Sequence, residues 1–187
     1  VKIDNSLFAG ILTQGANVSA VNCLFGNSAK YSAVISIGGS VNFDHCTFGN
    51  YWGSVRNTGL FAFSDYYESG STIQYRPFTM ANFTNSIIYG NNDNEFVIDT
   101  LGRNITGSAP IFNFANCLIK TDTTIANANF FLNCMTNSDP LFIDPYFWDY
   151  HVPINSSAVG EAFGSATGID LDGNGRFGNT IGCYEYQ

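Results

Sequence analysis

Hydrophobic and polar residues alternate along short stretches of this chain, and each stretch breaks at a corner residue, usually Asn, that is followed by a small residue. Residues 21–27 (VNCLFGN) show the full pattern: an apolar residue, Asn, a small residue, one outward residue, a large apolar residue and a closing Gly-Asn. Close copies stand at residues 3–8, 43–50, 83–91 and 114–119, with a looser copy at 131–135. This recurrence identifies an internal repeat, and its alternation predicts strands rather than helices.

The corner positions of the repeat fall at irregular intervals. In chain order they are Asn5, Asn22, His45, Asn85, Asn116 and, in the looser copy, Asn133. A constant phrase at variable spacing predicts stacked coils that share one regular wall and carry loops of different length at their other corners. Asn tolerates the left-handed backbone of a tight corner, so we expect a hydrogen-bonded ladder of these side chains, with His45 as a structural member. The large apolar residues after the corners should stack inside: Phe8, Phe25, Phe48, Ile88 and Ile119.

These features predict an all-β chain folded as a single-stranded right-handed parallel β-helix of the pectin-lyase-like kind. Residues 1–136 should form its coils, and residues 137–187, where Pro and Gly accumulate, an irregular C-terminal cap on the same structural domain. Other strand-bearing segments are expected at 33–37, 60–63, 79–91, 95–99 and 111–120. An opening coil without a neighbour would expose an unpaired edge, so we expect upstream coils and an export signal to precede residue 1 in a longer polypeptide.

Composition agrees with strands joined by turns and narrows the range of partners. Of the 187 residues, 45% are hydrophobic, only 12% are charged and 19 are Gly. The net charge is −8, with seven Lys plus Arg spread along the chain, which argues against nucleic acid and against an anionic membrane surface as partners. No apolar run approaches the ~20 residues of a membrane-spanning helix.

Five cysteines occur, and most of them occupy one position of the repeat. Cys23, Cys46 and Cys117 directly follow a corner residue, as Cys134 does in the looser copy. Disulfides or a metal site are the functional alternatives. The lack of a CxxC pair and the presence of only two His favour instead a small buried residue that alternates with Ser at the same position.

The tail contains a series of short phrases. They are Asp139-Pro140-Leu141-Phe142 with Asp144, Asp149-Tyr150-His151, Ser156-Ser157-Ala158, Asp170 with Asp172-Gly173-Asn174, Arg176, and Ile181-Gly182-Cys183-Tyr184-Glu185-Tyr186. In this order they resemble the C-terminal signature of bacterial right-handed β-helix proteins of the choice-of-anchor Q type, common in Bacteroidetes. The resemblance implies an exported surface protein whose tail precedes an anchoring signal. This chain departs from the family's usual residues at three positions: it has Ser157 for Pro, Thr180 for Asp and Cys183 for Ala. Because position 180 carries no acid, a salt bridge that the family's Asp makes near Arg176 is not expected in the same form here.

A calcium-loop pattern stands in the tail at Asp170, Asp172 and Asn174. The position at which an EF-hand needs a bidentate Glu is occupied by Ile181, so the EF-hand interpretation fails. A turn of Asp, Asn and Gly is the simpler interpretation, with calcium as the one cofactor left open.

Asp149, His151 and Glu161 are the candidate acid–base set of the tail. Glycosidases need paired carboxylates at a defined separation. In the resembling family, however, the position of His151 is a packing residue, which favours a structural role.

Two three-residue phrases match a short O-glycosylation pattern of Bacteroidetes. They are Asp99-Thr100-Leu101 and Asp122-Thr123-Thr124. We treat both as candidate modification sites.

Two long loops interrupt the repeat where the corner spacing is widest, at residues 49–59 and 64–77. On a β-helix, long loops from neighbouring coils wall a groove in which extended polysaccharides bind. Aromatic rings stack on sugar faces while charged groups bond the hydroxyls. The candidate glycan-binding residues are therefore Tyr51, Trp52, Arg56, Asp65, Tyr66, Tyr67, Glu68, Tyr75 and Arg76. The alternative is that these aromatics pack the loops onto the coils.

The pattern and the resemblance together predict an exported protein of the bacterial cell surface that binds glycans without catalysis, or that serves as an adhesive or structural stalk. The expected partners are a polysaccharide or a cell-surface protein, and upstream coils of the same polypeptide. Two alternatives stay open: a polysaccharide-degrading lyase or glycoside hydrolase, and a structural subunit of a larger cell-surface assembly.

Overall fold

The computed structural model describes residues 1–100, 112–122, 130–164 and 168–187. Within these ranges the chain is made of β-strands, turns and one short 3-10 helix, η1, at Pro145–Phe147. No helix among the described residues is long and apolar enough to cross a membrane. The predicted all-β class is confirmed.

Three parallel sheets carry most of the strands. Sheet A contains β1 (Lys2–Ile3), β4 (Leu24–Gly26), β7 (Thr47–Asn50), β12 (Ile87–Gly90), β15 (Leu118–Ile119) and β17 (Met135–Thr136). Sheet B contains β2 (Ala9–Gln14), β5 (Tyr31–Ser36), β8 (Phe61–Ser64) and β13 (Phe96–Asp99). Sheet C contains β3 (Asn17–Val21), β6 (Gly39–Asp44), β11 (Phe78–Thr84), β14 (Asn113–Ala115) and β16 (Phe131–Leu132). A separate antiparallel hairpin is formed by β9 (Tyr66–Ser69) and β10 (Thr72–Tyr75).

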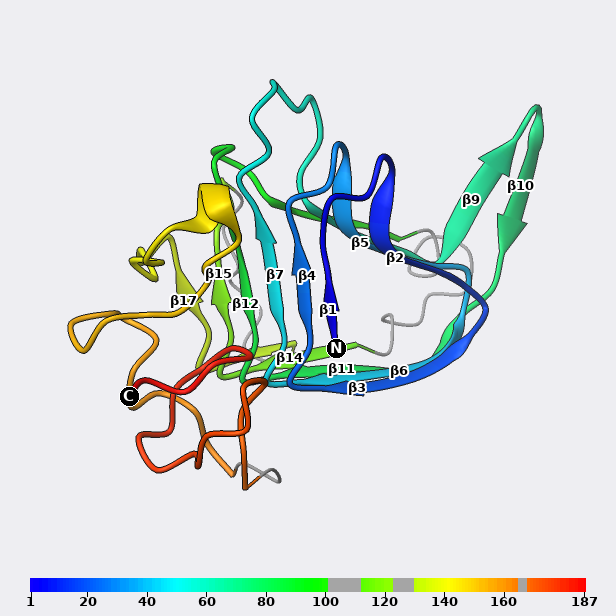
Figure 1. The fold of residues 1–187 in the computed structure, drawn as a ribbon. Helices are drawn as coiled ribbons and strands as arrows, with labels where there is room; N and C mark the ends of the chain where they lie inside the picture. The colour runs from blue at the N-terminus through cyan, green and yellow to red at the C-terminus, as the bar shows by residue number, and fades with distance from the viewer. Residues whose placement is uncertain (101–111, 123–129, 165–167) are drawn as a thin grey trace.

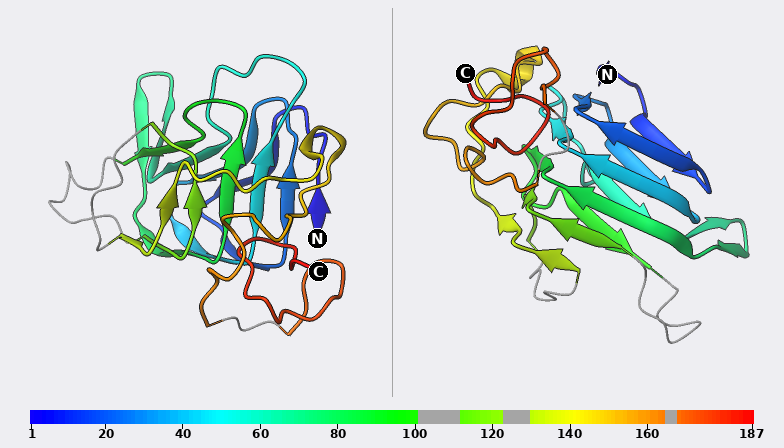
Figure 2. Two further views of the ribbon diagram at one scale, coloured as in Figure 1. Left: turned by 90° about the vertical axis from the view of Figure 1, so that its left-hand side faces the viewer. Right: turned by 90° about the horizontal axis from the view of Figure 1, so that it is seen from below.

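From β1 to β15 the chain visits sheets A, B and C in turn, so that each sheet grows by one strand on each passage, and the last described strands are β16 of sheet C and β17 of sheet A (Figure 1). Strands of one sheet lie side by side in sequence order, as their colours show in Figure 2. The segments expected at 33–37, 60–63 and 95–99 are strands β5, β8 and β13. The last strand ends at Thr136, and the tail then packs as irregular chain on the outward face of sheet A, where Tyr150 and Ile181 contact Leu24 and Ile87 (Figure 2).

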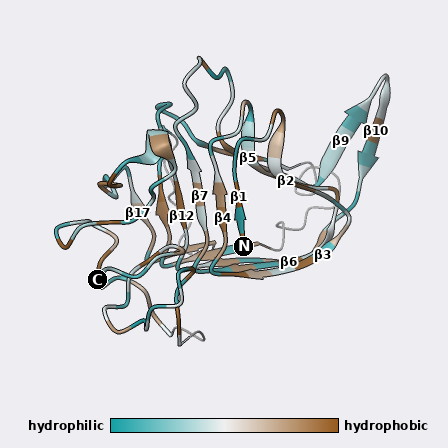
Figure 3. Ribbon diagram, viewed as in Figure 1, coloured by the Kyte–Doolittle hydropathy of each residue, from teal (hydrophilic) through white to brown (hydrophobic). Residues whose placement is uncertain are grey.

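The three sheets share one apolar interior, to which each contributes its inward residues. In sheet C the rings of Phe43, Phe83, Phe114 and Phe131 stack on one another with centroid separations of 5.4, 4.4 and 5.3 Å. Parallel in-register pairing places equivalent side chains directly over each other, so one Phe per strand becomes a continuous stack. Figure 3 shows hydrophobic residues along the strands of the sheets, including β4 and β12.

The register of sheet A corrects the predicted interior stack at its first member. Ile3 pairs with Phe25, Phe25 pairs with Phe48, and the column continues through Ile88 and Ile119. Phe8 lies outside this column, 49% exposed, with its ring against Tyr31. The prediction for Phe8 was therefore wrong.

The left-handed corners of the repeat are present at five positions. Asn22, His45, Asn85, Asn116 and Asn133 have φ between 48° and 51°. Their backbone amides continue the pairing from one strand to the next, as in the 3.1 Å bond from the His45 N–H to the Thr84 carbonyl.

Asn5 also has a positive φ, but it stands in another column. Its N–H donates to the carbonyl of Asn27, at the corner between sheets A and B, so Asn5 is not equivalent to Asn22. The pairing of Asn5 with Asn27 and of Ile3 with Phe25 therefore shifts the first copy of the phrase relative to the others. The same shift places Phe8 outside the interior stack.

The corner side chains do not form the uninterrupted ladder that we expected. Asn133 approaches Asn116 at 3.5 Å, and Asn85 donates to the Asp44 carboxylate at 3.0 Å. Asn22 instead bonds the tail, since its Nδ2 donates to the Ile169 carbonyl at 2.6 Å. The tail competes successfully for these amides because it covers the corner.

A buried ion pair organises this part of the tail. Arg176 lies 3.4 Å from the Glu185 carboxylate, and both side chains are almost fully enclosed. Thr180 donates its hydroxyl to the same carboxylate at 3.0 Å. Glu185 is thus the acidic partner of Arg176, and the Thr at position 180 supplies a hydrogen bond to it.

All five cysteines are described and all are free thiols. Burial raises the pKa of Cys46 and of Cys117 well above that of a free thiol. The Sγ atoms of both lie beside backbone carbonyls of the interior at 3.4–3.6 Å. This environment fits the interpretation of Cys as a small buried residue.

Candidate functional site

The two long loops lie at different corners of the molecule. Residues 51–60 connect β7 of sheet A to β8 of sheet B, whereas the hairpin β9–β10 lies between sheet B and sheet C. Figure 1 shows the hairpin projecting away from the loop after β7. The strands of sheet B separate the two loops, so they do not wall a common groove as predicted from the sequence.

The hairpin presents part of the predicted glycan-binding set to solvent. Tyr67 and Glu68 are exposed, and Tyr75 is half-buried. The Tyr66 hydroxyl donates to the Asp99 carboxylate, and this bond, with some burial, raises the pKa of Tyr66 to about 12. Tyr66 therefore fastens the hairpin to sheet B.

The base of the hairpin holds the two remaining candidates of that loop. Asp65 is buried, and its carbonyl accepts the Arg76 N–H at 2.9 Å. Arg76 is exposed. Of these two residues, only Arg76 has a side chain that can reach a ligand.

Arg56 was predicted to contact a ligand, and the structure corrects this. Its guanidinium is fully enclosed and pairs with the Glu95 carboxylate, which is equally buried. It also donates to the carbonyls of Asn50 and Thr58. Burial raises the pKa of Glu95, while Arg56 opposes that shift. The pair holds the 51–60 loop against the turn before β13.

An aromatic hollow of about 360 Å³ lies on the sheet A side of this loop. We call it the aromatic hollow, and its lining residues are Asn5, Asn27, Tyr51, Trp52, Gly53, Ser54, Tyr146 and Trp148. Both tryptophans of the chain line it, one from the loop and one from the tail. The rings of Tyr51 and Tyr146 meet edge to face at 5.5 Å. Large rigid rings converging on one concavity are typical of a binding site.

Asn27 joins the loop to the tail at the base of the aromatic hollow. Its Oδ1 accepts the Tyr51 N–H at 2.7 Å and the Tyr150 hydroxyl at 2.6 Å, and its Nδ2 donates to the Pro145 carbonyl at 2.6 Å. Burial raises the pKa of Tyr150. A Cβ at Gly49 would stand 2.1 Å from the Tyr150 ring, so this close approach requires Gly.

Trp148 adopts a backbone conformation that bulky residues rarely adopt. Trp148 is the C-cap of η1 and has a φ of 65°. Its N–H donates to the Pro145 carbonyl at 3.3 Å. Left-handed backbone at a large side chain is unfavourable and is found most often where function or packing requires it. Here it sets the indole at the mouth of the aromatic hollow.

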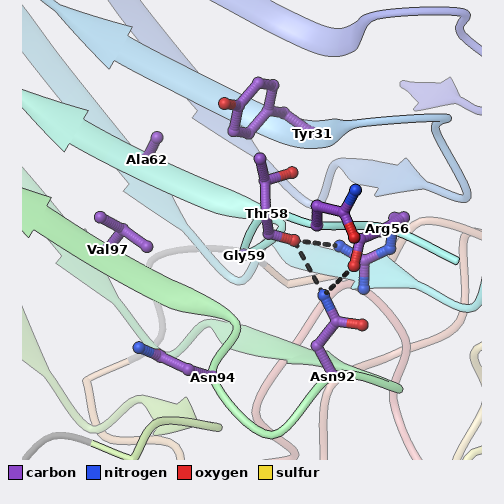
Figure 4. Close-up of a pocket in the computed structure, with 9 residues that line it drawn as sticks. Tyr31, Arg56, Thr58, Gly59, Ala62, Asn92, Asn94 and Val97 are labelled. Atoms are coloured by element: carbon purple, nitrogen blue, oxygen red, sulfur yellow. Dashed lines mark hydrogen bonds between the residues drawn. The ribbon is translucent and has the colours of Figure 1, made fainter.

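A second concavity of about 530 Å³ lies on the sheet B side of the same loop (Figure 4). We call it the amide cleft, and its lining residues are Tyr31, Arg56, Asn57, Thr58, Gly59, Ala62, Asn92, Asn94 and Val97. A smaller hollow of about 340 Å³ adjoins it, shares Tyr31 and residues 56–58, and extends to Phe8 and Lys30. The loop is thus flanked by concavities on both sides.

Sequence reasoning identified one half of this arrangement. Tyr51 and Trp52 were predicted and do line the aromatic hollow. Tyr146 and Trp148 were missed, although the crowding of aromatics there was a visible signal. Asn92 and the other cleft amides carried no signal, because Asn is frequent throughout the chain.

The calcium candidate is explained by backbone hydrogen bonds. The Asp170 carboxylate accepts the N–H groups of Asp172, Asn174 and Glu185 at 2.8–2.9 Å. Among the described residues no group of three or more His, Cys, Asp and Glu could hold a metal ion. This hydrogen-bond pattern is that of a turn, in which the Asp170 carboxylate accepts three backbone N–H groups.

His151 stands between two carboxylates of the tail. Its Nδ1 lies 2.6 Å from Asp149 and its Nε2 lies 3.0 Å from Asp172, while the ring stacks on Tyr184 at 3.9 Å. Both ring nitrogens therefore lie beside carboxylates of the tail, and the ring packs on Tyr184, which fits a structural role. Glu161 is exposed and is not part of this arrangement.

The glycosylation matches are only partly within the described residues. Asp99, Thr100 and Asp122 are described, whereas Leu101, Thr123 and Thr124 lie outside the described ranges.

Comparison with protein-family models gives no match, and comparisons with curated proteins and with solved structures give no significant match. The resemblance of the tail to the choice-of-anchor Q signature therefore stays a prediction.

Proposed function

We propose that this chain is a right-handed parallel β-helix that binds glycans without catalysis and acts on the outside of a bacterial cell. The cyclic order of the three parallel sheets supports the β-helix, because successive coils would add one strand to each sheet. Right-handedness follows from the strong preference of parallel crossover connections for that hand.

The aromatic hollow is the observation that carries the binding proposal. Trp52, Trp148, Tyr51 and Tyr146 converge on a concavity large enough for a sugar residue. Aromatic faces pack against the apolar faces of sugar rings, and polar edges bond the hydroxyls. Asn5, whose side chain makes no hydrogen bond to the described residues, supplies an amide for this purpose.

The lining residues support binding rather than bond cleavage. Neither the aromatic hollow nor the amide cleft nor the smaller hollow includes an Asp, Glu or His among its lining residues. Glycoside hydrolysis by the usual mechanisms needs two carboxyl groups across the scissile bond. The net charge of −8 further favours an uncharged glycan over an acidic one.

Export and surface location rest on the resemblance of the tail. A surface-anchored β-helix with a glycan site would serve adhesion or nutrient capture. In the alternative of a structural subunit, the same aromatic hollow would receive a side chain or a glycan of a partner protein.

Intrinsic fluorescence and a glycan array test the proposal together. Because both tryptophans line the aromatic hollow, a glycan identified on the array should change the tryptophan emission upon titration. Trp52→Ala and Trp148→Ala should each weaken binding at least about tenfold, since each removes a stacking ring. Tyr67→Ala, on the exposed hairpin, is the matched control and should bind like wild type. Wild type that binds no glycan, or Trp variants that bind unchanged, would refute the proposal.

A further inference from the structure

We propose that the amide cleft is a second subsite of the same glycan, and that it takes an uncharged sugar carrying an N-acetyl group. This inference rests on the proposed function and specifies its ligand.

The floor of the cleft is apolar although it lies on the outer face of a sheet. Leu12, Val34, Ala62 and Val97 pair in register and form one outward column across sheet B. Val97 is 41% exposed at the cleft. An alternating strand normally presents polar residues outward, so this column offers apolar surface to a ligand. The methyl group of an acetamide is small enough to pack on Ala62 and Val97.

Two asparagines at the cleft have complementary groups left to bond a ligand. Asn94 Oδ1 accepts the Phe96 N–H at 3.2 Å, and within the part of the chain that the structure describes Asn94 Nδ2 has no acceptor. Asn92 Nδ2 donates to the carbonyls of Thr58 and Arg56 at 2.9 and 3.3 Å, and its Oδ1 accepts no hydrogen bond from the described residues. Figure 4 shows the Asn94 nitrogen directed away from Asn92, toward the side of Val97.

An acetamido group matches this set of unused groups. Its carbonyl needs a donor, its N–H needs an acceptor and its methyl needs an apolar contact. The exposed amide of Asn57, which makes no hydrogen bond to the described residues, adds a further donor and acceptor. Tyr31 supplies a ring at the edge of the cleft for the sugar itself.

The residues that line the cleft favour an uncharged sugar over an acidic one. Arg56 lines the cleft, but its charge is compensated by Glu95, and both side chains are fully enclosed. Lys30, in the adjoining hollow, stands over the ring of Phe8 at 5.5 Å. A sugar carboxylate or sulfate would therefore find no uncompensated cation among the residues that line the amide cleft itself.

The loop between the two concavities is held in place before any ligand arrives. Arg56, within the loop, and Asn92, outside it, both donate to the Thr58 carbonyl, and Glu95 accepts the Leu60 N–H at 2.9 Å. Preformed walls reduce the ordering cost of binding. A glycan that crosses this loop would place one sugar in the aromatic hollow and the next acetylated sugar in the amide cleft.

Titration calorimetry with two matched oligosaccharides tests the inference. Chitotetraose carries the acetamido groups, and cellotetraose has the same linkage without them. Wild type should bind chitotetraose at least about tenfold more tightly, because the unused amide groups of the cleft are satisfied only by that ligand. Equal affinities, or binding to no N-acetylated oligosaccharide, would overturn the inference.

Variants assign the preference to the cleft. Asn94→Asp keeps the acceptor for the Phe96 N–H but removes the donor, and should lower the affinity for chitotetraose about tenfold while leaving that for cellotetraose unchanged. Leu12→Ser, in the same outward column but outside the cleft, is the control and should leave both affinities unchanged. An unaltered preference in Asn94→Asp would contradict the inference.

The same experiment separates this inference from the proposed function. Trp52→Ala should weaken both oligosaccharides if the aromatic hollow is the main site. If Asn94→Asp removes the preference while Trp52→Ala changes nothing, the proposal for the aromatic hollow fails and the cleft stands as the glycan site. If Trp52→Ala weakens both oligosaccharides equally and wild type shows no preference, only the N-acetyl inference fails.

Discussion

Arg176 donates two hydrogen bonds to the side-chain oxygen of Asn22, a residue 154 positions earlier in the chain, at 3.2 Å from Nε and 2.6 Å from the terminal nitrogen. Asn22 is the left-handed corner of the best copy of the repeat, and Arg176 is the buried cation of the tail. The pair joins the regular part of the molecule to its irregular cap. Stability at this corner therefore has two sources, the backbone conformation and the bond to the tail.

Substitutions at Asn22 should separate these two sources. Asn22→Gly keeps the left-handed backbone accessible and should cost about 1–3 kcal/mol, because the buried guanidinium of Arg176 loses one of its acceptors. Asn22→Ala should cost about 1 kcal/mol more, since Ala is also strained at this φ. Urea unfolding of the two variants measures the difference. Equal stability of both would contradict the role of the backbone, and neither should change glycan binding per folded molecule.

Gly49 should be intolerant of a side chain because of Tyr150. A Cβ there would lie 2.1 Å from the ring, and Gly49→Ala should destabilise by about 1–3 kcal/mol through overpacking. Gly53→Ala is the matched control: it belongs to the following loop, nothing lies within 4 Å of its Cβ, and its stability should stay within about 0.5 kcal/mol of wild type. Thermal unfolding followed by circular dichroism compares the two. Similar melting temperatures would show that the ring can move away.

The buried pair of Arg56 and Glu95 should behave as a unit. Arg56→Met leaves a buried carboxylate without its partner and should cost about 3–5 kcal/mol. Combining it with Glu95→Gln removes the isolated charge and should recover part of that loss, although Gln keeps only some of the bonds to the Leu60 and Asn92 backbone. A double-mutant cycle from denaturant unfolding measures the coupling. Additive effects of the two substitutions would contradict this account.

Acid should weaken the molecule through Asp44. Burial would raise the pKa of its carboxyl, but hydrogen bonds from His45, Thr84 and Asn85 outweigh burial and lower that pKa below 3.8. A carboxyl with a lowered folded pKa contributes stability that is complete above pH 3.8 and is lost as the pH falls through the folded pKa. The free energy of unfolding of wild type should therefore fall more steeply below about pH 4 than that of Asp44→Asn. Parallel pH profiles of the two proteins would refute this.

The local pattern was sufficient for several features of the fold. Alternation placed Phe25, Phe48 and Cys46 inside, and the Asn of each phrase occurs with the left-handed backbone that was predicted. These features depend on a residue and its nearest neighbours in the chain, so five or six letters contain the needed information.

Other features depended on which segments become neighbours in space. The first phrase looks like the others, yet strand pairing sets Ile3 beside Phe25 and moves Phe8 to the surface. Arg56 was expected to face a ligand, but it is buried because Glu95 folds against it from the next passage of the chain.

The sequence by itself determined the corners and most of the strands and inward residues, since each follows from local alternation and turn chemistry. It did not predict the hairpin β9–β10, which lies in a segment expected to be a loop, or the surface position of Phe8. The tertiary structure alone decided the candidate site. The aromatic hollow requires Trp52 and Trp148, which come from a loop and from the tail. Hydrogen bonds of Asn27 to both segments and the ring contact of Tyr51 with Tyr146 bring these segments together. Such long-range contacts depend on which strands lie next to each other and in which register. Because the loops between strands vary in length, the spacing of residues along the sequence does not reveal these neighbours.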